Sequence, residues 1–213
     1  MTRRDIVVVG ASAGGIEAIT TLLRDLPADL GASMFIVLHI SPQSPGYLAE
    51  IFDKAGPLPV VTGRDREAFT TGKVYVAPAD HHLLLAASGC LCVTRGPPEH
   101  RARPAIDPLF RSAAVAFGPR VIGVVLSGAL RDGSAGLREV KMSGGTTVVQ
   151  DPADALVDSM PSSALRNADV DYCRPAADLA FLIGELVRTE AQRPTPPSGK
   201  LRRASFVASG DCD

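Results

Sequence analysis

The chain has 213 residues, enough for one large domain with a sizeable core and short for two. Its 22 Lys and Arg residues nearly balance 23 Asp and Glu residues, so the net charge of −1 gives no overall field that would attract nucleic acid or an anionic membrane. A membrane span needs about 18–20 consecutive apolar residues, and no run in the chain approaches this length, so we expect no membrane insertion. The 4 cysteines form no CxxC pair, so we expect no disulfides.

The first element is predicted to be a buried strand over residues 5–10. Two arginines precede its apolar run and resemble the start of a signal peptide, but the run is short and Glu17 follows soon after. We therefore expect a cytoplasmic protein. A helix over 14–25, a strand over 34–40 and a helix over 47–54 follow, with helical spacing of apolar residues in the first of these helices.

The region from 57 to 95 has a different pattern, with short β segments predicted over 59–62, 73–77, 82–86 and 90–94. Ser88-Gly89 between the last two indicates a hairpin. We expect this region to form an antiparallel addition at one edge of the sheet.

Alternation of helices and strands returns after this region. The predicted elements are helices over 106–117, 133–142, 160–167 and 176–188, and strands over 121–126 and 146–150. This alternation predicts an α/β fold, a doubly wound and mostly parallel sheet with helices on both faces. Prolines and small polar residues dominate from Glu190 onward, so we expect a domain over 1–189 and a flexible tail over 190–213.

Ser12 is the first candidate for chemistry. It lies in Gly10-Ala11-Ser12-Ala13-Gly14-Gly15, which matches the G-x-S-x-G turn that presents a nucleophilic serine between a strand and a helix. The small neighbours let the backbone bend closely, and the following helix offers N–H groups to a developing oxyanion. A loop that binds phosphate and a plain structural turn stay open as readings of this motif.

His39 and Asp132 are the partners that such a serine needs. His39 lies at the carboxyl end of a predicted strand, where parallel sheets bind ligands, although a hydrogen-bonded core histidine is the alternative. Asp132 follows the apolar strand 121–126 and would orient the imidazole, a role compatible with capping the helix near Gly133. The three residues together predict a Ser-His-Asp triad.

Several segments resemble, in the right order from about residue 5 to 188, the catalytic domain of the bacterial chemotaxis protein-glutamate methylesterases. The segments are Gly10-Ala11-Ser12-Ala13-Gly14-Gly15, Leu38-His39-Ile40, Val74-Tyr75-Val76-Ala77-Pro78-Ala79-Asp80-His81-His82, Arg103-Pro104-Ala105-Ile106-Asp107-Pro108-Leu109-Phe110 and Leu126-Ser127-Gly128-Ala129-Leu130-Arg131-Asp132-Gly133.

This resemblance implies hydrolysis of glutamate γ-methyl esters on methyl-accepting chemotaxis receptors, and it is compatible with deamidation of receptor glutamines, which many members carry out. It implies that Ser12 is the nucleophile, His39 the general base and Asp132 the orienting acid, and that the backbone N–H of Ala129 is an oxyanion donor. It implies receptors or other signalling proteins as partners. The two-step acyl transfer expected of such a triad requires no cofactor and no metal. Adjacent His81 and His82 would point to opposite faces of a strand, which disfavours a shared metal there.

The sequence departs from the family pattern in three ways. Ala13 stands where members often have threonine, and Ala129 where many have methionine. The familiar full-length enzymes join a receiver domain to the esterase, whereas the esterase-type sequence here starts at residue 5, so we expect no receiver domain in this chain. Two other functions stay open: an esterase with a different substrate, and a non-catalytic module that keeps the fold and binds a signalling partner.

Overall fold

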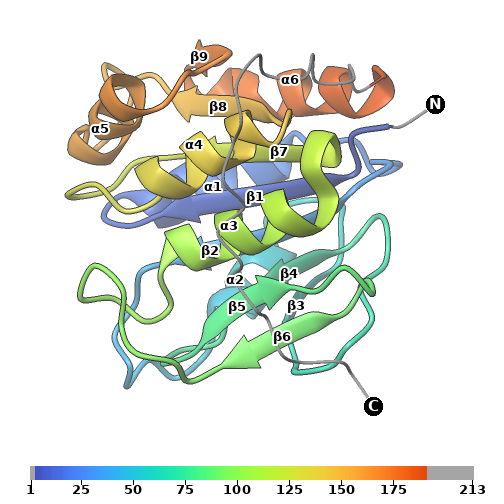
Figure 1. Ribbon diagram of the computed structural model, residues 1–213, viewed down its shortest axis with the longest axis vertical. Coiled ribbons are helices and arrows are strands. Elements are labelled where there is room, and N and C mark those ends of the chain that lie inside the picture. The colour runs from blue at the N-terminus through green and yellow to red at the C-terminus, as the bar shows by residue number, and fades with distance from the viewer. Residues whose placement is uncertain (1–2, 191–213) are drawn as a thin grey trace, which may run out of the picture.

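The computed structural model describes residues 3–190, which form one parallel sheet between two layers of helices (Figure 1). The sheet has seven strands in the order β3-β4-β2-β1-β7-β8-β9, and every neighbouring pair is parallel. The strands are β1 (Ile6–Ala11), β2 (Ser33–Leu38), β3 (Val60–Thr62), β4 (Val74–Val76), β7 (Val121–Val125), β8 (Thr146–Gln150) and β9 (Tyr172–Arg174).

Two hydrophobic cores lie on opposite faces of this sheet. Helices α1 (Gly15–Arg24), α2 (Leu48–Asp53) and α6 (Ala176–Arg188) enclose one core, and α3 (Ile106–Phe117), α4 (Ser134–Met142) and α5 (Ser159–Asn167) enclose the other. A short 3₁₀ helix, η1 (Gly118–Arg120), links α3 to β7. Strand β1 serves both cores, because Val7 and Val9 face one and Ile6 and Val8 face the other. A strand buried on both faces must be apolar throughout, which explains the continuous apolar runs in the sequence.

The predicted fold class is confirmed, with one correction in the region from 57 to 95. Among the strands of this region, only β5 (His82–Leu85) and β6 (Leu91–Thr94) pair antiparallel, and this hairpin packs against α3 as a separate sheet. Strands β3 and β4, which we expected to join the antiparallel addition, are parallel members of the main sheet. Strand β4 pairs with β2, which is distant in the sequence, and β3 then pairs in parallel with β4. Local turn signals therefore did not reveal the direction of pairing.

The sequence also missed β9, a three-residue strand that pairs with β8 at the other edge of the sheet. The expected tail falls almost entirely on residues 191–213, outside the described residues. Among residues 3–190, no helix combines the length and the apolar character needed to cross a membrane.

The order of the strands determines where a site can form. Strand β1 lies between β2 and β7, so the chain leaves β1 in opposite directions to build the two halves of the sheet. In open parallel sheets, ligands bind beyond the carboxyl ends of strands where the strand order reverses in this way. Ser12 follows β1, His39 follows β2, and the segment leading to Asp132 follows β7. All three predicted site residues are therefore at this edge.

Close packing between α1 and the loop after α2 gives a test of the fold. A Cβ atom on Gly56 would overlap the backbone carbonyl of Leu23, which cannot move aside as a side-chain end can. Gly56→Ala is expected to lower the free energy of unfolding by about 1–3 kcal/mol, measured by urea denaturation. Gly31→Ala is the matched control, because its Cβ would meet only Val187 Cγ1, at an ordinary 3.5 Å. Equal stability of the two variants would contradict this packing.

Candidate active site

Ser12 is held on a tight turn between β1 and α1. Its N–H donates to the Ser127 carbonyl over 2.9 Å, and its carbonyl accepts the N–H of Gly15, also over 2.9 Å. Gly14 has φ 75°, in the left-handed region, and a Cβ there would lie 2.6 Å from Ser127 Oγ. The turn therefore requires glycine for both its conformation and the space beside Ser127.

His39 lies beside Ser12 because β1 and β2 are in register up to these two residues. Ala11 pairs with Leu38, and the N–H of His39 donates to the Ala11 carbonyl over 3.1 Å. The imidazole is 19% exposed, so it reaches the surface near Ser12 and is not enclosed in the core. The alternative of a core histidine is therefore excluded for this side chain.

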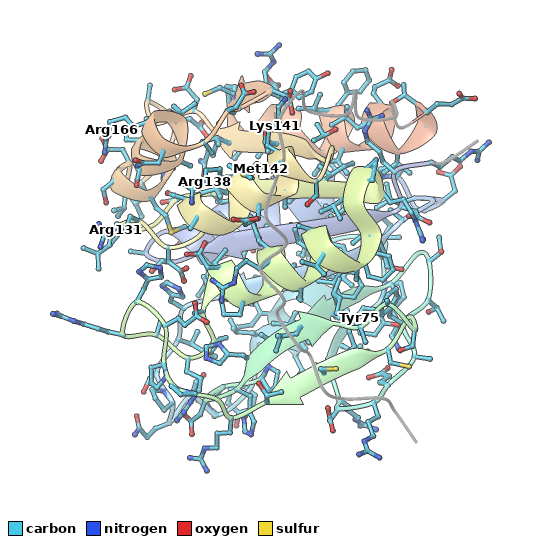
Figure 2. All side chains as sticks on the ribbon, viewed as in Figure 1. Tyr75, Arg131, Arg138, Lys141, Met142 and Arg166 are labelled. Atoms are coloured by element: carbon cyan, nitrogen blue, oxygen red, sulfur yellow. The ribbon has the colours of Figure 1, made fainter. Side chains whose placement is uncertain are left out.

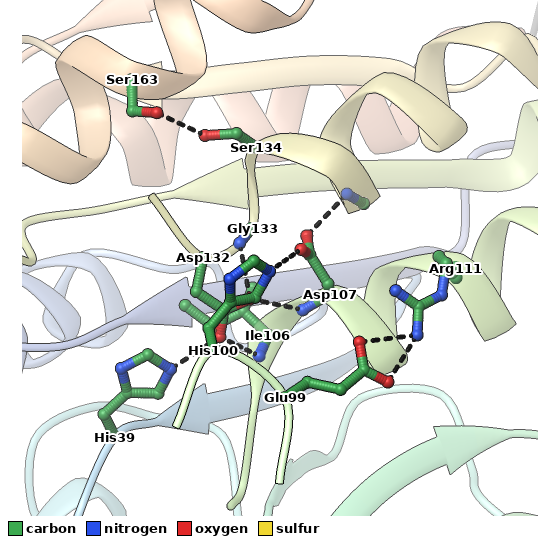
Figure 3. Close-up of polar contacts among 11 residues, drawn as sticks. His39, Glu99, His100, Ile106, Asp107, Arg111, Asp132, Gly133, Ser134 and Ser163 are labelled. Atoms are coloured by element: carbon green, nitrogen blue, oxygen red, sulfur yellow. Dashed lines mark hydrogen bonds and ion pairs between the residues drawn. The ribbon is translucent and has the colours of Figure 1, made fainter. Parts of the chain in front are cut away.

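The imidazole of His39 is hydrogen-bonded to Asp132, as Figure 3 shows, with 2.7 Å between Nε2 and Oδ2. The Asp132 carboxylate is buried and also accepts three backbone N–H groups, from Ile106 at 2.7 Å, Asp107 at 3.1 Å and Gly133 at 2.9 Å. Four donors thus fix both oxygens of this carboxylate.

The hydrogen bonds decide the charge of Asp132. Burial by itself would raise its pKa, but the hydrogen bond from His39 and the backbone N–H groups outweigh it, and the pKa lies below its usual range. Asp132 is therefore an ionised acceptor for the imidazole. Capping of the helix near Gly133 was the alternative role for Asp132, and its carboxylate does accept the Gly133 N–H. It also accepts the first N–H groups of α3, a helix from a distant part of the chain, which the sequence did not indicate.

Ser12 and His39 are neighbours but, within residues 3–190, no hydrogen bond joins the Ser12 hydroxyl to the imidazole. Nε2 is engaged by Asp132, so Nδ1 is the nitrogen left to accept a proton. Hydrogen bonds of catalytic groups are often long or poorly aligned before substrate binds, so this arrangement is compatible with a serine–histidine pair.

The loop after β7 lies directly against Ser12. A Cβ atom on Gly128 would lie 2.9 Å from Ser12 Cβ and 2.6 Å from Met160 Cε. Gly128 is tied on both sides, since its N–H donates to the Val157 carbonyl and its carbonyl accepts the N–H of Met160, each over 2.9 Å. The next residue, Ala129, is exposed, and its N–H has no partner within residues 3–190. An N–H group in this place is free to bind a substrate oxygen.

Sequence reasoning missed two residues that hold the serine turn. The buried Ser127 hydroxyl donates to the Ala13 carbonyl over 2.8 Å and accepts the Val157 N–H over 3.0 Å. The Ser127 N–H in turn donates to Gln150 Oε1 at 2.8 Å, at the end of β8. A polar residue at the carboxyl end of a buried strand was the signal available for Gln150.

A second histidine–aspartate pair, also missed, lies beside the first (Figure 3). His100 Nε2 is 2.9 Å from Asp107 Oδ2, and Asp107 Oδ1 accepts the Gly136 N–H over 2.6 Å. Burial and the charge of Asp132 raise the pKa of Asp107. Side-chain atoms of His100, Asp107 and Asp132 lie within 4.8 Å of one another, but hydrogen bonds within the protein already occupy the carboxylates.

Asp80, His81 and His82 do not converge on a common point. Asp80 forms ion pairs with Arg95 and Arg103, the second at 2.6 Å. His81 Nδ1 bonds to the Ala79 carbonyl, and His82 Nε2 bonds to the Pro97 carbonyl. These side chains hold the loop that leads into α3. The Arg103 guanidinium is bound within the protein, by Asp80 and by the Gly96 carbonyl.

Comparisons with known proteins agree with this architecture. The Thermotoga maritima CheB methylesterase catalytic domain superposes with a TM-score of 0.82 and 32% identity, covering 88% of this chain and 100% of that one. A Leptospira interrogans relative, provisionally named protein-glutamate methylesterase/protein-glutamine glutaminase, is 39% identical over 84% of this chain and 92% of its own length.

A relative from Anaeromyxobacter dehalogenans, named protein-glutamate methylesterase/protein-glutamine glutaminase 2, is 37% identical over 87% of this chain, which spans only 54% of that protein. The model of the CheB methylesterase family matches residues 7–183, and the chain belongs to that family.

Proposed function

We propose that this chain is a serine hydrolase that removes γ-methyl groups from glutamate side chains of chemoreceptors in the cytoplasm, and that it also deamidates receptor glutamines. The names of its relatives specify both activities, which need the same acyl transfer chemistry. The proposed residues are Ser12 as nucleophile, His39 as general base and Asp132 as orienting acid.

The observation that carries this proposal is the 2.7 Å hydrogen bond from His39 Nε2 to a buried, ionised carboxylate, formed next to a serine on a glycine-rich turn. A loop that binds phosphate through backbone N–H groups does not require a histidine–carboxylate pair, so this pair favours hydrolysis over phosphate binding. A buried carboxylate beside imidazole fixes the tautomer with Nε2–H toward Asp132 and favours the imidazolium that forms during the reaction.

The reaction proceeds in two steps. His39 Nδ1 accepts the Ser12 proton while Ser12 Oγ attacks the ester carbonyl, and collapse of the tetrahedral intermediate transfers that proton to methoxide, so that methanol leaves. Water, deprotonated by His39, then attacks the glutamyl-serine ester. As the second tetrahedral intermediate breaks its bond to Ser12 Oγ, His39 returns the proton to Ser12, and the glutamate is released. With a glutamine substrate the first leaving group is ammonia. The Asp132 carboxylate stabilises the imidazolium in both steps without taking its proton.

We assign the oxyanion to backbone donors. The N–H of Ala129 lies in the loop packed against Ser12 and needs no side chain for this role. Ala13 supplies no hydroxyl next to the nucleophile, but its backbone carbonyl accepts a hydrogen bond from the Ser127 hydroxyl. The turn is therefore held without a polar side chain at position 13.

Replacement of the nucleophile gives the first test. Ser12→Ala is expected to lower the rate of methanol release from a methylated chemoreceptor cytoplasmic fragment by about 10³-fold or more, because no acyl-enzyme can form. Ser88→Ala, an exposed serine in the β5–β6 turn, is the matched control and should keep the wild-type rate. A Ser12→Ala protein with undiminished activity would rule out the proposed mechanism.

Asp132→Asn tests the orienting acid. We expect kcat to fall about 10²–10⁴-fold with little change in KM, since the amide cannot stabilise the imidazolium. The rate should be measured below the melting temperature of the variant, because its amide NH₂ would face backbone donors at α3. An unchanged kcat would contradict the assigned role.

The same variant makes a prediction about pH and stability. A carboxylate whose folded-state pKa is lowered contributes stability that is present above its unfolded pKa and is lost as pH falls through the folded pKa. The wild type should therefore have a higher free energy of unfolding than Asp132→Asn at neutral pH, where this difference reaches its maximum. The difference should decrease below about pH 4. Urea titrations at several pH values measure it, and a pH-independent difference would contradict the ionised state of Asp132.

A further inference from the structure

Two leucines stand exposed beside the serine turn. Leu156 is 76% exposed, and its Cβ would lie 2.7 Å from a Cβ on Gly14, two residues after Ser12. Leu130 is 72% exposed and follows the loop residue Gly128, which packs against Ser12. Isolated exposed leucines are ordinary, but here two flank one catalytic serine.

Leu130 is held in its exposed position by the fold. Its φ of 70° is in the left-handed region, which is unfavourable for a branched side chain. Its N–H donates to Ser159 Oγ over 3.1 Å, and that hydroxyl donates to the Gly128 carbonyl over 3.2 Å. A strained backbone that presents an apolar side chain to solvent beside a catalytic serine is typical of a contact made with a substrate.

A basic surface continues from these leucines along α4 and α5. Arg131, Arg138 and Arg166 are exposed and lie on one face of the molecule (Figure 2). Within residues 3–190 their guanidinium groups form no ion pair and no hydrogen bond. A hydrogen bond between Ser134 and Ser163 joins the first residue of α4 to the middle of α5. Arg138 and Arg166 each lie about one turn further along their helices. Lys141, by contrast, is paired with Asp169 and Asp171.

We propose that Leu130, Leu156, Arg131, Arg138 and Arg166 form a docking surface for an acidic, amphipathic segment of the protein substrate. This inference rests on the proposed function of the Ser12 site. The leucines contact apolar side chains next to the scissile ester, while the arginines pair with carboxylates further along the segment. Because the chain has a net charge of −1 and no overall attraction for an acidic partner, attraction must come from local patches such as this one.

The arginines lie away from the reacting atoms, so the surface and the chemistry can be tested separately. The double variant Arg138→Glu/Arg166→Glu is expected to lower kcat/KM for a methylated chemoreceptor cytoplasmic fragment by about tenfold, mainly through KM, and to weaken its dependence on ionic strength. Hydrolysis of p-nitrophenyl acetate, which is too small to reach the patch, should stay within about twofold of wild type.

Arg24→Glu/Arg188→Glu is the matched control, because these exposed arginines end α1 and α6 on the opposite face of the sheet. It makes the same change in net charge and should leave kcat/KM for the receptor fragment near the wild-type value. An equal loss in both double variants, or a loss that is equal for the small ester, would overturn the docking surface.

Leu156→Ser tests the apolar part. It should raise KM for the receptor fragment even at 0.5 M salt, a concentration at which the contribution of the arginines is screened to roughly a 4 Å range. An unchanged KM would contradict a role of Leu156 in binding the substrate segment.

Binding of the fragment to a Ser12→Ala protein, by calorimetry, separates this inference from the hydrolytic one. Binding that is lost on reversal of Arg138 and Arg166 supports the surface even if no methanol is released. An affinity that does not change when the charges of Arg138 and Arg166 are reversed would contradict the docking surface, whatever the rate of hydrolysis.

Discussion

The carboxylate of Asp132 is the group on which the site depends. A buried negative charge is stable only when donors surround it, and here an imidazole and three backbone N–H groups do so. Two of those N–H groups begin α3, whose positive end favours the charge. The same contact therefore satisfies a helix terminus, keeps the acid ionised and fixes the orientation of His39.

The helix ends around this carboxylate support one another. Asp132, which precedes α4, accepts N–H groups at the start of α3, and Asp107 in the first turn of α3 accepts the N–H of Gly136 in the first turn of α4. The two acids thus tie the same pair of helices together in opposite directions. Asp107 lies near a like charge and has a raised pKa, and His100 is its nearest opposing group.

The nucleophile depends on backbone contacts of another kind. Ser12 has no side-chain hydrogen bond within residues 3–190, and its position comes from the turn, from the Ser127 carbonyl and from the close approach of Gly128. The surface around it is correspondingly shaped by the loop after β7, which carries Ala129, Leu130 and Arg131 in succession. Hydrolysis and recognition of the substrate are therefore proposed for adjacent residues of one loop.

The sequence by itself determined the helices, every strand except β9, and the three residues at the sheet edge. Apolar runs of strand length, helical periodicity and the G-x-S-x-G turn are local signals. They predict structure because interactions between residues close in the chain form these elements. It did not determine that β3 and β4 pair in parallel, that β9 exists, or that Asp132 caps α3.

Those features, like the contacts of His100, Ser127 and Gln150, join residues far apart in the chain. Only packing decides which distant polar group satisfies a buried donor or acceptor. The tertiary structure therefore decided how the predicted serine, histidine and aspartate are held, and which exposed side chains surround them.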